Sequence, residues 1–157
     1  MRKRRGQIID GVVLIDKPEQ WSSNQALQRV KRVLDAQKAG HTGTLDPFAT
    51  GLLICCLGKA TKLAGRMLDA DKQYVATLKF GQETDSGDLT GEVVADLGDQ
   101  FTRPTPEQIE TVLKQFLGTI EQVPPMTSAL KHKGKPMYHY ARQGVVIERP
   151  PREVTIH

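Results

Sequence analysis

The sequence has only two cysteines and lacks any hydrophobic run that could cross a membrane. The longest apolar run, residues 52–57, is far shorter than the roughly 20 residues of a transmembrane helix. No cleavage pattern of a signal peptide follows the basic start of the sequence. We therefore expect a soluble protein that works in the cytoplasm without contact to a membrane.

The scarcity of cysteine also limits the metal and redox chemistry. Cys55 and Cys56 are adjacent. Adjacent side chains on a strand point to opposite faces, so this pair is poorly placed to form a disulfide or to share a metal ion. No Cys-x-x-Cys spacing is present, and the four histidines match no familiar set of zinc ligands. We expect two buried thiols and no metal site.

Basic residues are concentrated in the N-terminal half of the chain. Residues 1–72 hold 13 basic and 7 acidic side chains, a net charge of +6, whereas residues 73–157 hold 9 and 11, a net charge of −2. Lysine and arginine give sequence-independent affinity for phosphates, so this half suits a nucleic acid partner. For the basic residues 2–5, a solvated tail is an equally good interpretation.

The pattern of apolar residues predicts one domain that mixes strands and helices. A chain of 157 residues with 38% hydrophobic residues can bury one core. Strands are predicted from apolar runs or alternation at residues 11–15, 52–57, 74–80, 93–95 and 152–157. Helices are predicted from apolar residues at helical spacing at residues 26–34, 59–68 and 106–117. This content indicates an α+β fold.

Several of these segments carry expectations about the core. In the second helix Leu63, Met67 and Leu68 should point inward, and the third helix should cover the sheet with its apolar face. Residues 74–80 alternate most clearly, with Tyr74 at the start of the predicted strand. A tyrosine at this position is typical of a packing residue, which is the alternative to a role in a site.

The most unusual stretch is residues 40–51, GHTGTLDPFATG. It has three glycines and one proline in twelve positions and no apolar alternation, so it predicts a shaped loop rather than a helix or strand. The proline after Asp46 favours extended backbone angles at this aspartate and can fix the direction of its carboxylate. An ordinary turn, in which the aspartate bonds nearby backbone amides, is the alternative.

This stretch resembles the motif GHTGxLDPxATG of the TruB-type tRNA pseudouridine synthases and matches it at every fixed position. Other segments resemble further motifs of the family: GVVLIDK at residues 11–17 with Pro18, Ser22 and Ser23, DKQY at residues 71–74, GQ and TD at residues 81–85, SALK at residues 128–131 and YARQG at residues 140–144. The chain departs from the family in the turn after Lys17 and Pro18, which typically contains a glycine and here reads Glu19, Gln20 and Trp21. The resemblance covers most of the chain.

The resemblance implies a mechanism and a set of site residues. Asp46 would be the nucleophile, Tyr74 would stack on a uracil flipped out of the RNA, and His41 would support the rearranged RNA loop. Lys17 would brace the catalytic loop from the neighbouring strand. The reaction would convert the T-loop uridine of tRNA, at position 55, to pseudouridine with no cofactor and no metal. Attack on the ribose and attack on the uracil ring both remain open for Asp46.

Two other functions compete with this one. A tRNA-binding or RNA-folding module would hold the T-arm without turnover, and it would not need Asp46. A hydrolase would need a second carboxylate to activate water, and the sequence offers no convincing one. Residues 131–140 interleave lysines with Tyr138 and Tyr140, which suits contact with phosphates and bases, although a surface loop could have the same composition.

The family fold implied by the resemblance is a mixed, largely antiparallel sheet with flanking helices, followed by a small RNA-binding domain. Residues 1–157 would form an incomplete catalytic domain, because the predicted last strand stops without a turn and an arginine partner for Asp46 should lie beyond His157. We expect this chain alone to have little or no activity. Its terminal strand should associate unless a second chain segment completes the sheet.

Overall fold

The computed structural model describes residues 6–68, 70–128, 130–141 and 143–157. The chain divides into two compact units, Met1–Tyr74 and Val75–His157. The basic residues 2–5, for which the sequence left a solvated tail or an RNA contact open, lie outside the described residues, as do Ala129 and Arg142 of the late motifs. The assignment of residues 1–157 to one incomplete catalytic domain stays a prediction.

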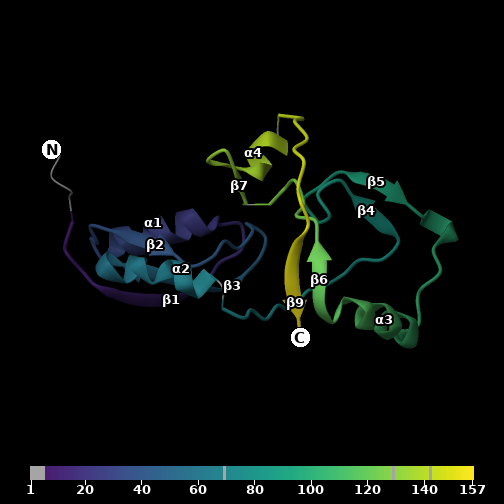
Figure 1. Ribbon diagram of the computed structural model, residues 1–157, viewed down its shortest axis with the longest axis horizontal. Helices are drawn as coiled ribbons and strands as arrows, with labels where there is room; N and C mark the ends of the chain where they lie inside the picture. The colour runs from purple at the N-terminus through teal and green to yellow at the C-terminus, as the bar shows by residue number, and fades with distance from the viewer. Residues whose placement is uncertain (1–5, 69, 129, 142) are drawn as a thin grey trace. The chain divides into compact units, whose positions relative to one another are not determined.

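The first unit is a three-stranded antiparallel sheet with a helix on one face (Figure 1). Its elements are β1 (Gly11–Lys17), α1 (Ser23–Val33), β2 (Ala39–His41), β3 (Gly51–Leu57), a 3-10 turn (Gly58–Lys62) and α2 (Ala64–Leu68). The strand order is β1-β3-β2. Lys17 pairs with Gly51 and His41 pairs with Cys55. The central strand β3 therefore pairs with β1 along one edge and with β2 along the other.

The core of the first unit forms between α1 and β3. Ala26 and Leu27 of the helix are buried against Leu53 and Cys55, which share one face of the strand. Cys56 is buried as well, so the prediction of two buried thiols is confirmed. Burial raises the pKa of both thiols, and the neighbouring Cys56 raises the pKa of Cys55 further. Both side chains therefore stay protonated and act as small apolar residues.

The start of α1 follows from its first residues. Ser22 is the N-cap: its hydroxyl accepts the backbone N–H of Gln25 at 3.2 Å, and the Gln25 side chain accepts the backbone N–H of Ser22 at 2.8 Å. This reciprocal capping box satisfies two donors that a helix otherwise leaves unpaired. Ser23 is the first residue inside the helix, and its hydroxyl is free to bond outside it.

The second unit consists of short paired strands and helices (Figure 1). Its elements are β4 (Gln82–Thr84), β5 (Val93–Asp96), a 3-10 turn (Gly98–Gln100), α3 (Pro106–Leu113), a second 3-10 turn (Lys114–Phe116), β6 (Gly118–Gln122), β7 (Lys131–His132), β8 (Lys135–Pro136), α4 (Met137–Ala141) and β9 (Arg152–Ile156). β4 pairs with β5, β7 with β8, and β6 with β9, all antiparallel. The predicted last strand thus exists and has a partner on one edge.

Residues 74–80 do not form the strand that their alternation predicted. No described residue pairs with this segment, and Val75 is fully exposed. Alternation marks two faces of an extended chain, but a strand also requires a neighbour that exchanges backbone hydrogen bonds with it. This prediction was wrong because sequence periodicity does not specify the neighbour.

Two predicted helices are also shorter and less buried than expected. In residues 59–68 a 3-10 turn precedes α2, and Leu63 and Leu68 are half-exposed rather than inward. α3 ends at Leu113, a 3-10 turn follows, and the apolar face that should cover a sheet is exposed at Val112 and Phe116. Helical spacing marks an apolar face, but burial also needs another element packed against that face, and these side chains remain exposed.

Candidate functional site

The predicted central loop connects β2 to β3, and it starts later than the sequence indicated. Gly40 and His41 belong to β2 rather than to the loop, and Gly51 is the first residue of β3. The irregular part is residues 42–50. Because β2 and β3 are antiparallel neighbours, this loop projects from one end of the sheet.

Asp46 lies at the first position of a tight turn in this loop. The backbone N–H of Ala49 donates to the carbonyl oxygen of Asp46 at 3.1 Å, with Pro47 at the second position. Proline fits this position because its fixed φ matches the turn, and aspartate is common at the first position. The side chain of Asp46 is exposed, and no described residue donates a hydrogen bond to its carboxylate or pairs with it. The carboxylate is therefore available to a ligand.

The residue before Asp46 is held by the first turn of α1. The Ser23 hydroxyl accepts the backbone N–H of Leu45 at 2.8 Å and donates to the carbonyl of Leu45 at 3.1 Å. Ser23 is only 2% exposed. One buried hydroxyl thus satisfies both backbone groups of the residue that precedes the candidate nucleophile.

The residue after Asp46 is held by the last residue of β1 and by the turn that follows it. The Lys17 ammonium is 0% exposed and donates to the carbonyls of Pro47 at 3.2 Å, Trp21 at 2.6 Å and Pro18 at 2.9 Å. The backbone N–H of Gln20 donates to the same Pro47 carbonyl at 2.6 Å. A buried charge is tolerated only with good hydrogen bonds, and here three carbonyl dipoles supply them. Lys17 therefore ties the turn after β1 to the loop.

Gln20 has a backbone φ of 66°, a left-handed conformation that favours glycine. This is the turn in which the family typically has a glycine and this chain does not. At the far end of the loop, Gly51 has a φ of 117°, and its N–H donates to the Asp16 carboxylate at 3.0 Å. The loop is therefore fixed at Leu45, Pro47 and Gly51 by contacts from β1, the turn after it and α1.

The other two predicted site residues differ in their relation to the loop. His41 is half-buried at the end of β2, just before the loop, and its Nδ1 atom is buried without a hydrogen-bond partner among the described residues. Tyr74 is the last residue of the first unit and is 69% exposed. Among the described residues, its hydroxyl forms no hydrogen bond with the loop. Lys17, His41 and Asp46 are thus grouped around one loop, whereas Tyr74 is not joined to them.

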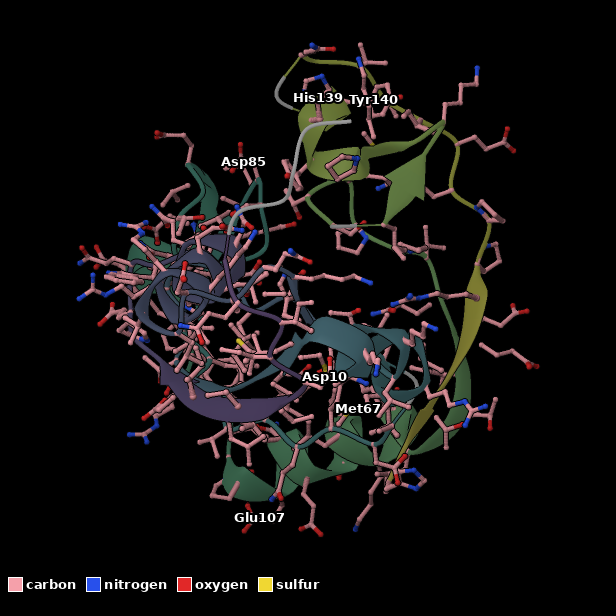
Figure 2. All side chains as sticks on the ribbon, turned by 90° about the vertical axis from the view of Figure 1, so that its left-hand side faces the viewer. Asp10, Met67, Asp85, Glu107, His139 and Tyr140 are labelled. Carbon is pink, nitrogen blue, oxygen red and sulfur yellow. The ribbon has the colours of Figure 1, made fainter. Side chains whose placement is uncertain are left out.

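The predicted aromatic and basic segment forms a hairpin and the short helix α4. The rings of His139 and Tyr140 meet edge to face, with centroids 6.0 Å apart (Figure 2). Lys133 and Lys135 on the preceding hairpin are exposed. Exposed cations beside aromatic rings suit phosphates and bases, and their contact with RNA stays a prediction.

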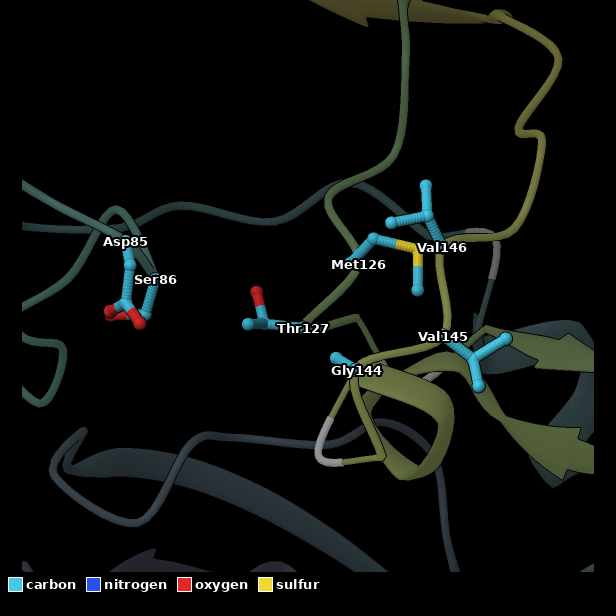
Figure 3. A pocket seen from close by; sticks show the side chains of 8 residues that line it. Asp85, Ser86, Met126, Thr127, Gly144, Val145 and Val146 are labelled. Carbon is cyan, nitrogen blue, oxygen red and sulfur yellow. The ribbon is translucent and has the colours of Figure 1, made fainter.

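The second unit also contains a pocket of about 280 Å³ that the sequence did not predict (Figure 3). It is lined by Asp85, Ser86, Met126, Thr127, Ala141, Gly144, Val145 and Val146. The Asp85 carboxylate accepts the N–H of Glu92 at 3.0 Å, and the Ser86 hydroxyl donates to Asp88 at 2.8 Å. Asp85 and Ser86 thus bond within their own hairpin, and most of the other residues that line the pocket are apolar.

Within the part of the chain that the structure describes, no three histidine, cysteine or acidic side chains come together as metal ligands. None of the helices in that part combines the length and the apolar character that spanning a membrane requires.

The sequence around this loop is shared with known proteins. Residues 31–157 match the model of the TruB family pseudouridylate synthase, N terminal domain. The chain belongs to this family. A TruB-family relative named tRNA pseudouridine synthase B, from Bordetella pertussis, is 65% identical over 156 residues, which are 99% of this chain and 64% of that protein. The protein of the same name from Hydrogenovibrio crunogenus is 55% identical over 157 residues, 51% of its length.

The TruB-family chain also resembles a solved structure. A chain in the crystal structure of a Cbf5-Nop10-Gar1 complex matches it with a TM-score of 0.55 and 30% identity, over 80% of this chain and 32% of that one. The family predicted from the loop motif and the α+β fold class are therefore confirmed. The chain spans less than two thirds of the length of these relatives.

Proposed function

We propose that this chain is the part of a tRNA pseudouridine synthase that carries the nucleophile, and that the enzyme isomerises the T-loop uridine at position 55. The observation that supports this most is the exposed Asp46 carboxylate, presented on a turn whose flanking residues are held from β1 and α1. A tRNA substrate makes the cytoplasm the place of action. The isomerisation belongs to the intramolecular transferases.

The reaction breaks the bond between the ribose and the uracil nitrogen, turns the base and rejoins it through carbon. Asp46 can form a covalent intermediate by attack on the ribose carbon or on the electron-poor carbon of the uracil double bond. In either route the uridine must leave its stack to reach a carboxylate in the protein, at a cost of a few kcal/mol. The Asp46 carboxylate is unpaired and exposed on a rigid loop, so it needs little rearrangement before it attacks the flipped uridine.

The other residues have supporting roles in this proposal. The exposed ring of Tyr74 stacks on the flipped base. His41, at the end of β2 just before the loop, supports the rearranged T-arm. Lys17 acts through Pro47 and keeps the loop against β1. The basic first half of the chain attracts the phosphates of the T-arm.

Asp46→Asn in the intact protein tests the proposal. Turnover in a tritium-release assay with tRNA labelled at uridine carbon 5 should be lost, because the amide is not a nucleophile. Affinity for tRNA should stay within about tenfold, or about 1.4 kcal/mol, because binding is spread over many phosphate contacts.

Asp35→Asn is the matched control, since it makes the same change at an exposed aspartate beyond the end of α1. Its turnover should equal that of the wild type. If Asp46→Asn keeps near-normal turnover, Asp46 is not the nucleophile. If the wild type binds the T-arm but never turns over, the chain belongs to a tRNA-binding module instead.

A further inference from the structure

The two peptide groups that flank Asp46 are both fixed by hydrogen bonds, but from different sources. The peptide group between Asp46 and Pro47 is fixed within the loop, because its carbonyl accepts the N–H of Ala49 at 3.1 Å. The peptide group between Leu45 and Asp46 is fixed from outside the loop, because its carbonyl accepts the Ser23 hydroxyl at 3.1 Å. Since peptide groups are planar, these two bonds leave Asp46 little freedom to rotate.

Ser23 is suited to this task by its place in the fold. Its neighbour Ser22 uses its own hydroxyl for the capping box with Gln25, so the cap does not need Ser23. The Ser23 hydroxyl instead crosses to a residue 22 positions later in the chain and bonds both its N–H and its carbonyl. Both bonds are shielded from water, because Ser23 is 2% exposed.

We propose that Ser23 is a positioning residue that orients the Asp46 carboxylate through the backbone of Leu45. This inference rests on the proposed function of Asp46. Ser23 would act through the backbone alone, without contact to the carboxylate or to the substrate. Its loss leaves the nucleophile in place but allows the peptide group before it to rotate. A misplacement of about 1 Å at a reacting group can cost on the order of 100-fold in rate.

The test compares variants of Ser23 with a matched control in the intact protein. Ser23→Ala removes the hydroxyl. Ser23→Val and Ser23→Thr introduce side chains of nearly equal shape, and only the threonine retains a hydroxyl. Ser22→Ala is the control, because it weakens the same end of α1 without touching the loop. We expect Ser23→Ala and Ser23→Val to lower kcat by roughly 10- to 100-fold, with tRNA affinity within about threefold of the wild type. Ser23→Thr should recover a large part of kcat, and Ser22→Ala should keep it.

A second measurement does not depend on activity. The N–H of Leu45 should exchange with solvent at least about tenfold faster in Ser23→Ala than in Ser22→Ala, because only the first loses its acceptor. Equal kcat in Ser23→Ala and Ser22→Ala, equal kcat in Ser23→Thr and Ser23→Val, or unchanged exchange at Leu45 would each overturn the proposal. An active Asp46→Asn variant would instead reject the proposed function, and the exchange of Leu45 would still decide whether Ser23 holds the loop.

Discussion

Replacing Gln20 with glycine should stabilise the protein, although it removes a whole side chain. The left-handed φ of 66° at Gln20 costs a non-glycine residue roughly 1–2 kcal/mol. Glycine avoids this cost but makes the unfolded chain more flexible, which destabilises the folded protein by about 0.4–1 kcal/mol. The net gain should be about 0.5–1 kcal/mol, or a rise in Tm of about 1–4 °C. The bond from the N–H of residue 20 to Pro47 is a backbone bond and survives the change, so kcat should not change.

The neighbouring Glu19 provides the control. Its φ is not in the left-handed region, so Glu19→Gly should only make the unfolded chain more flexible and should destabilise the protein by about 0.4–1 kcal/mol. Denaturant unfolding of both variants beside the wild type gives the comparison. If Gln20→Gly destabilises the protein as much as Glu19→Gly does, the turn carries no strain that glycine relieves.

Three further predictions concern buried, exposed and charged side chains. Lys17→Met should lower the free energy of unfolding, measured in urea, by on the order of 1–3 kcal/mol for each carbonyl partner that is left without a hydrogen bond. A decrease below about 0.5 kcal/mol would mean that water replaces the ammonium. Tyr74→Phe should preserve tRNA binding, whereas Tyr74→Leu should weaken the productive complex by roughly 1–3 kcal/mol. Equal activity of the two variants would show that Tyr74 does not stack on the base. Partial burial raises the pKa of Asp88, but hydrogen bonds from Thr90 and Ser86 outweigh it and lower the pKa below its ordinary value. The Asp88 carboxylate therefore stabilises the folded protein above its unfolded pKa of about 3.9, and this contribution disappears as the pH falls through the folded pKa. Asp88→Asn should be less stable than the wild type at pH 7 and should approach the wild-type stability in acid. A difference in stability that does not change with pH would contradict this.

The elements that the sequence predicted well are those with a local cause. Ser22 caps α1 because its own side chain and that of Gln25 lie within one turn. The apolar run that became β3 is buried because Leu53 and Cys55 meet the apolar face of α1. The loop motif indicated the family, which the match over residues 31–157 confirmed.

The predictions that failed needed information from outside their own segment. Residues 74–80 alternate well, but a strand depends on a partner that periodicity does not name. The helical spacing at Leu63 and Leu68 was real, but both side chains stay half-exposed, because burial depends on a packing partner that spacing does not name. In the same way, the partners of Ser23 and Lys17 lie 22 and 30 positions away in the chain. The resemblance implied that Lys17 braces the loop, but the backbone atoms that Lys17 and Ser23 bond are known only from the fold.

The Asp46 carboxylate, in this proposal, converts one uridine of tRNA to pseudouridine. The decisive measurement maps pseudouridine by mass spectrometry in unmodified tRNA after incubation with the intact protein. We expect pseudouridine at position 55 with the wild type and with Asp35→Asn, and none with Asp46→Asn even though that variant still binds the tRNA. Pseudouridine formed equally well by Asp46→Asn, or formed by the wild type at other positions but not at 55, would contradict it.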